Sequence, residues 1–142
     1  MTHADAGRYA AKHTSGASPD KKIAAAVRQK AEDGKVACAE AESIGAALGV
    51  PLAEVGKTLD LLEIRIDRCQ LGLFGYPEGK ALHPATVDPG LESSIHDRLE
   101  AGRLPCRAAW EIAAERKIAR MEVSNTCEKL KIRIKPCQLG AF

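Results

Sequence analysis

Apolar residues recur at the spacing of amphipathic helices along most of the chain. From Ile23 to Ala31, and again from Leu91 to Leu99, an apolar residue stands at every fourth position. This spacing predicts a first helix in each half of the chain. Glycine favours the left-handed conformation that ends many helices, so we expect these two helices to end at Gly34 and Gly102.

Two further helices are predicted in each half. The second is expected at about residues 37–48 and 105–117, and the third at about 51–62 and 121–130. Pro105 suits the first turn of a helix, where its missing N–H costs nothing. Each half therefore carries three helices.

A short strand is predicted after the third helix of each half. The tripeptide Ile-Arg-Ile stands at residues 64–66 and again at 132–134, an alternation typical of a half-buried strand. Such a strand needs a partner edge. We expect it to pair with the short segment GKVAC or GRLPC before the second helix of its own half, because this pairing closes each small core locally. Pairing with the equivalent strand of the other half is the alternative.

The two halves also share residue identities. The segment IRIDRCQLGLFG, at residues 64–75, nearly recurs as IRIKPCQLGAF at residues 132–142. The shift that takes Cys69 to Cys137 aligns the halves without a gap from Ile23 to Phe74. One inserted residue would rotate a helix face by about 100°. We therefore predict a mostly α protein with short β segments, built as two tandem three-helix domains related by internal duplication.

Composition defines the remaining segments. Residues 1–20 are polar, rich in Ala, Gly and Ser and without periodicity, which predicts a flexible N-terminal tail. Residues 76–89 read as a proline-containing linker between repeat 1 (21–75) and repeat 2 (90–142). Each repeat is about 50 residues, near the lower size limit for independent folding, so we expect the repeats to bury surface against each other or against a second chain.

The composition is that of a soluble protein. The chain has 142 residues, of which 45% are hydrophobic and 28% charged. No apolar run approaches the roughly 20 residues that span a bilayer, and the N-terminus lacks the apolar core of a signal peptide. We expect a cytoplasmic protein without a membrane association.

The segment IGAALGVPLAEVGKTL, residues 44–59, resembles the general helix-turn-helix pattern of bacterial transcription regulators. In that pattern Gly45 is the small residue where the two helices cross, Gly49 makes the turn, and Val50 and Val55 fix the second helix. The resemblance covers about half of each repeat. Repeat 2 departs from it, because Arg116 and Lys117 stand where an apolar residue and the turn glycine are expected.

The resemblance implies two winged-helix-like domains that bind double-stranded DNA. Helix-turn-helix proteins generally bind as dimers to half-sites about 34 Å apart, and a tandem repeat would provide this pseudo-dimer in one chain. Bases are contacted by Arg, Lys, Asn, Gln or Ser, and phosphates by cations. The candidate DNA-binding residues are Lys57, Arg65, Arg68, Arg120, Ser124, Asn125, Lys129, Lys131, Arg133 and Lys135. Most lie in repeat 2, because acidic residues balance the cations of repeat 1.

Charge and fold keep other functions open. The formal net charge is only +2, below that of a dedicated nucleic-acid binder. Three-helix folds of this kind also serve as protein-interaction modules, so a non-enzymatic adaptor, acting on a protein partner or as a homodimer, is the alternative. No His/Asp/Ser or paired-carboxylate arrangement recurs in the two repeats and no phosphate loop follows a strand, so we predict no enzyme and no cofactor.

The cysteines permit a third function. Cys38, Cys69, Cys106 and Cys137 are related by the repeat. Together they could hold a metal or iron–sulfur cluster, or form two redox-switchable pairs, in a metal or redox sensor. None of them forms a C-x-x-C pair and none has a nearby histidine. We therefore expect these four residues to be buried, apolar and metal-free.

Overall fold

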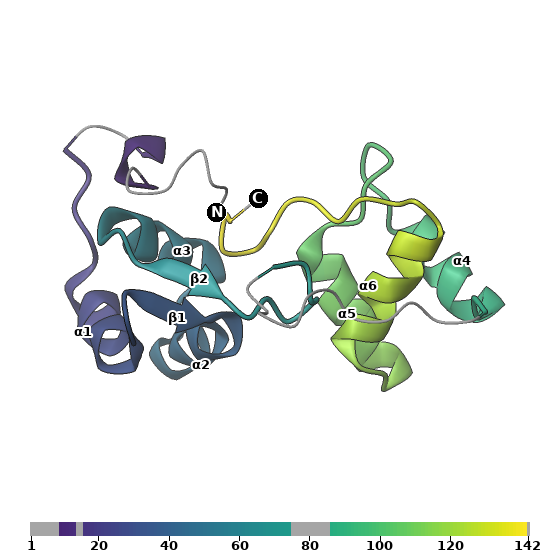
Figure 1. Cartoon of the computed structure of the whole chain (residues 1–142), viewed down its shortest axis with the longest axis horizontal. Helices are drawn as coiled ribbons and strands as arrows, with labels where there is room; N and C mark the ends of the chain where they lie inside the picture. Colours follow the sequence, from purple (N-terminus) through teal and green to yellow (C-terminus); the bar gives the residue numbers. More distant parts are fainter. Residues whose placement is uncertain (1–8, 14–15, 75–85, 142) are drawn as a thin grey trace. The chain divides into compact units, whose positions relative to one another are not determined.

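A computed structural model describes residues 9–13, 16–74 and 86–141 of the chain (Figure 1). Over these residues the protein is mostly helical, with one small two-stranded sheet, as the sequence predicts. The elements, in chain order, are the short 3-10 helix η2 (Tyr9–Lys12), α1 (Lys21–Lys30), β1 (Lys35–Ala37), α2 (Cys38–Leu48), α3 (Leu52–Leu61), β2 (Arg65–Asp67), α4 (Pro89–Asp97), α5 (Cys106–Arg116) and α6 (Arg120–Lys129). None of these helices is long and apolar enough to cross a bilayer.

The chain divides into two compact units that do not follow the expected repeat boundaries. Unit 1 contains the described residues up to Cys69 together with the C-terminal segment from Gln138, and unit 2 runs from Gln70 to Cys137. The Gln-Leu-Gly segment of each repeat thus belongs to the unit formed by the other repeat. Most of the expected linker, residues 76–85, lies outside the described residues.

The core of unit 1 lies between its three helices and its sheet. Ile23 and Val27 of α1 and Val55 and Leu59 of α3 are fully buried, and Val36 of β1 joins them. Their spacing of four places them on one face of each helix, as the sequence pattern predicts.

The first helix of unit 1 ends earlier than expected. Its N-terminus is capped by Asp20, whose carboxylate accepts a hydrogen bond of 2.9 Å from the Ile23 amide. It ends at Lys30. Asp33 and Gly34, both at positive φ, instead form the tight turn that brings Glu32 opposite Lys35.

The strand that follows the third helix pairs within its own half of the chain, which confirms the favoured alternative. In unit 1, β1 and β2 run parallel with Val36 opposite Ile66. In unit 2 the equivalent contact is a single parallel bridge between Leu104 and Ile134. Both pairings are parallel, as expected when two helices form the connection between the paired segments.

A left-handed residue joins the second and third helices of each unit. In unit 1 this residue is Gly49, at φ 66°, and a Cβ on Gly45 would lie only 3.1 Å from the Leu52 side chain. Gly45 is therefore the close-contact residue that the sequence predicts. In unit 2 the turn residue is Lys117, at φ 56°, so the lysine adopts the glycine conformation against its steric preference.

Replacing Lys117 by glycine should therefore stabilise unit 2. Relief of the left-handed strain is expected to raise the free energy of unfolding by up to about 1 kcal/mol, partly offset by the greater entropy of glycine in the unfolded chain. The measurement is urea unfolding followed by the fluorescence of the single Trp110. The matched variant Gly49→Ala should destabilise unit 1, whose unfolding is followed by circular dichroism because Trp110 lies in unit 2. Equal signs for the two changes would contradict the prediction.

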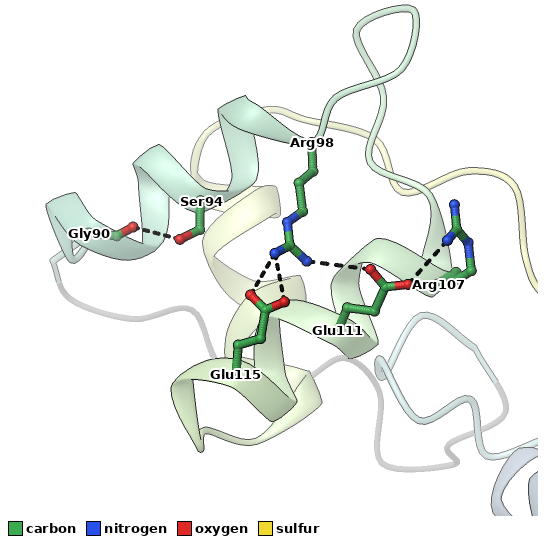
Figure 2. Close-up of polar contacts among 6 residues, drawn as sticks. All are labelled: Gly90, Ser94, Arg98, Arg107, Glu111 and Glu115. Carbon is green, nitrogen blue, oxygen red and sulfur yellow. Dashed lines mark hydrogen bonds and ion pairs between the residues drawn. The ribbon is translucent and has the colours of Figure 1, made fainter.

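Unit 2 packs α4 and α6 against α5. Leu91 and Ile95 of α4, Ile112 of α5 and Val123 of α6 are buried at its centre. At the surface, Arg98 extends from the end of α4 toward α5 and bonds Glu115 at 2.8 Å (Figure 2). This exposed ion pair adds little stability, because solvent screens it.

Part of the segment expected to be a flexible tail is ordered against α3. The buried Tyr9 and its neighbour Ala10 donate their amides to the carboxylate of Glu63, at 2.9 and 2.8 Å. Lys12 Nζ and His13 Nε2 reach the buried carboxylate of Asp60, at 3.1 and 2.8 Å. Sequence composition could not reveal this segment, because its contacts lie with residues about 50 positions away.

Candidate nucleic-acid interface

The candidate interface lies at the end of α6 and along the segment that follows. Lys129 occupies the last residue of the helix, and Lys131, at φ 59°, turns the chain into an extended segment. Along that segment exposed Lys131, Arg133 and Lys135 alternate with half-buried isoleucines. Alternation places Arg133 and Lys135 on one face of the extended chain, and Lys131 stands at the turn just before it. We call Lys129, Lys131, Arg133 and Lys135 the basic strip.

No carboxylate in the described part of the chain pairs with the basic strip. Ion pairs elsewhere in unit 2 join arginines to glutamates of α5 or to Asp88. The strip includes none of those arginines, and its four residues are exposed. Cations arranged in this way are suited to contacting successive phosphates.

Unit 1 offers no equivalent strip. At the matching positions stand Leu61, Glu63, Arg65 and Asp67, of which only Arg65 is a cation. The Glu63 carboxylate is already occupied by the amides of η2. The two units therefore differ in the sign of their charge at the same place in the fold.

Arg120 is held within unit 2. Its guanidinium lies 3.8 Å from the centre of the Trp110 ring and donates a hydrogen bond of 2.7 Å to the side chain of Gln70. Gln70 belongs to the Gln-Leu-Gly segment of repeat 1, and the next residue, Leu71, is almost fully buried. Arg120 thus anchors a peptide segment of the protein itself.

The remaining candidates differ in accessibility. Ser124 is only 4% exposed, so its hydroxyl cannot reach a base. Asn125, the next residue of α6, is half-buried, as is Lys57 of α3. Arg65 and Arg68 of repeat 1 are exposed, and Arg68 has contacts within the protein.

The third helix of each unit contacts the Gln-Leu-Gly segment that comes from the other repeat. We call these two segments the exchanged segments. In unit 1 a Cβ on Gly56 would overlap the carbonyl of Leu139, so the C-terminal segment lies directly on α3. Asp60, one turn further along α3, is covered by Lys12 and His13. The repeated CQLG is visible in the sequence. The sequence does not show which unit each copy packs against.

The expected burial of the four repeated cysteines is confirmed at three positions. Cys38, Cys69 and Cys106 are buried, and so is Cys127, which has no cysteine counterpart in repeat 1. Cys137 is only half-buried and departs from the expectation. None is in a disulfide. Within the described ranges no three His, Cys, Asp or Glu side chains gather in a way that could hold a metal ion.

Burial raises the pKa of the Cys127 thiol from 9.0 to about 12. The unfolded chain ionises this thiol near pH 9 while the folded chain retains the proton, so the stability of unit 2 should fall above pH 9 by about 1.4 kcal/mol per pH unit from this group. The measurement is urea unfolding at pH 8 to 10, read by Trp110 fluorescence. Cys127→Leu, which introduces the residue of repeat 1 at this position, should lose less stability over that range; an identical decline would contradict the assignment.

Comparison with known proteins identifies no relative. No model of a protein family matches the chain, and neither the curated proteins nor the solved structures contain one that is significantly similar.

Proposed function

We propose that the protein binds double-stranded DNA and acts as a cytoplasmic transcription regulator or an accessory DNA-binding protein. In this proposal the two units arose by internal duplication and each is a reduced winged-helix domain. The matching bounds of α2 and α5, and of α3 and α6, support this origin, as does the left-handed turn between the second and third helices in both units.

The observation that carries the proposal is the basic strip. Four exposed cations without carboxylate partners in the described chain follow the helix that a helix-turn-helix protein presents to DNA. The strip takes the place of a wing and contacts the phosphate backbone, while Asn125 is the residue of α6 best suited to a base contact. Repeat 1 contributes little, because its third helix is covered and Arg65 is the only cation at its matching positions, beside two acids and a leucine.

The proposal differs in one respect from a standard helix-turn-helix interaction. Because Ser124 is buried and Arg120 holds Trp110 and Gln70, α6 cannot present its full outer face to the major groove. Binding is therefore dominated by phosphates and depends weakly on sequence.

The experiment is a titration of fluorescein-labelled duplex DNA with the full chain, repeated at several salt concentrations. We expect binding at low salt whose logarithmic affinity falls linearly with the logarithm of salt concentration, with a slope of about −3 to −4 for four phosphate contacts. Shuffled duplexes should bind within a few-fold of each other. No binding at low salt would refute the proposal.

The alternative function is a protein-interaction adaptor. The observation that favours it is that α3 and α6 already hold peptide segments of this chain. A protein that failed to bind DNA but retained these peptide contacts would be assigned to this class.

A further inference from the structure

The C-terminal segment is seated on α3 as a peptide ligand would be. Leu139 and Ala141 are 3% and 4% exposed, and the carbonyl of Gly140 accepts a hydrogen bond of 3.0 Å from Lys12 Nζ. The contact thus combines a buried leucine with a main-chain hydrogen bond, the two elements by which extended peptides are commonly recognised.

Gly56 makes this contact sterically specific. A Cβ at this position would lie 2.6 Å from the carbonyl carbon and 2.9 Å from the Cα of Leu139, distances that the backbone of the segment cannot accommodate. Any other residue at position 56 would displace the segment. The α3 face around Gly56 therefore admits a peptide backbone because it lacks a side chain.

The corresponding position in unit 2 excludes the same mode of contact. There repeat 2 has Ser124, whose side chain is buried, and the segment from Gln70 is bound by Arg120. The two segments share the sequence Gln-Leu-Gly, yet their docking surfaces differ. The two surfaces therefore hold their segments by different contacts.

We propose that the α3 face around Gly56 is a peptide-binding site for the segment from Gln138 to Gly140, and that it accepts this segment from a second copy of the chain. The site and its ligand belong to different repeats, and the chain enters unit 1 at Gln138 after all of unit 2. Only non-covalent contacts identify the ligand, so the segment of another molecule satisfies them equally. Because the segment is tethered to its own chain, its effective concentration at the site is high. When this internal contact is lost, the segment of another chain can take its place.

Reciprocal exchange of this segment between two molecules would give a closed two-fold dimer. Each chain donates one segment and receives one, so no docking surface is left to bind a third chain. The proposal is independent of DNA binding, because it uses none of the residues of the basic strip.

Two complementary full-length variants test the proposal. Leu139→Asp disables the ligand and leaves the α3 site empty, whereas Gly56→Ala blocks the site and leaves the ligand without a place to bind. Each variant alone should be a monomer of 15.2 kDa. Mixed at equal concentration they should form a heterodimer of about twice that mass, detected by size-exclusion chromatography with light scattering, because only the mixture contains a competent site and a displaced segment.

The matched control is Gly45→Ala. This change also adds a methyl group to a buried helical glycine; its nearest neighbour, at 3.1 Å, is the end of the Leu52 side chain, which can shift, and repeat 2 has Ala113 at the equivalent position. Its own segment stays seated, and it should form no complex with Leu139→Asp. Failure of the Gly56→Ala and Leu139→Asp variants to associate, with circular dichroism showing both folded, would overturn the proposal.

A peptide measurement keeps the test decisive if Gly56→Ala fails to fold. A labelled peptide of sequence CQLGAF should bind Leu139→Asp saturably. It should bind the wild type at least about tenfold more weakly, since the internal segment competes there. Absence of binding to Leu139→Asp, or equal binding to both chains, would overturn the proposal.

Discussion

Replacing Lys129 and Lys131 together by alanine is expected to weaken duplex binding by about tenfold to a hundredfold near 0.1 M salt. Each lost phosphate contact reduces the slope of log affinity against log salt by about 0.9, so the double variant should show a slope smaller by about two. The loss should be similar for all duplex sequences, because phosphate contacts carry no sequence information. The measurement is the salt titration of labelled duplex described above.

The control for this prediction removes the same charge elsewhere. Lys21→Ala/Lys22→Ala deletes two exposed cations from α1 of unit 1 and changes net charge equally. Its salt slope should equal that of the wild type, and Lys57→Ala in α3 should likewise have little effect. Equal losses in both double variants would mean that binding follows net charge and not the basic strip.

Replacing Arg120 by alanine is expected to destabilise unit 2 by about 1–3 kcal/mol. The change removes both the cation–π contact with Trp110 and the charge-assisted hydrogen bond to Gln70. Trp110 is the only tryptophan of the chain, so its emission should shift as the ring loses its cover. Urea unfolding read by this emission measures the loss directly.

Arg133→Ala provides the opposite pattern. Arg133 is exposed, so its removal should change the unfolding free energy by less than about 0.5 kcal/mol while lowering the salt slope of duplex binding by about one. Arg120→Ala should leave that slope unchanged. If Arg120→Ala lowered the slope without loss of stability, Arg120 would be a DNA contact, as the sequence pattern predicts, and not an internal anchor.

The sequence predicted the helices well because their signals are local. The apolar spacing placed the second and third helices within one or two residues of their observed ends, and Gly45 and Gly49 lie at the predicted close contact and turn. The first helix ended early because Gly34 serves a tight turn, a use of glycine that sequence alone does not separate from helix termination.

The candidate site was only partly predictable because burial depends on distant segments. The exposure of Arg133 and Lys135 agrees with the pattern of alternating residues. The burial of Ser124 and the engagement of Arg120 could not be foreseen, since Arg120 bonds a residue 50 positions earlier in the chain. Nothing in the local sequence of α6 indicates that a segment of the other repeat lies there.

The exchanged segments also constrain the order in which the protein acquires its structure during synthesis. The contact between Lys12 and Gly140 joins residues 128 positions apart, and all of unit 2 is translated between them. Unit 1 therefore leaves the ribosome with the face of α3 at Gly56 still bare, whereas unit 2 already has its own segment from Gln70. Long-range contacts of this kind form late and slowly. During that interval the nascent chain exposes the α3 face that we propose a second copy occupies. Chains made close together on one messenger would therefore meet at the stage when we expect exchange between them to be easiest.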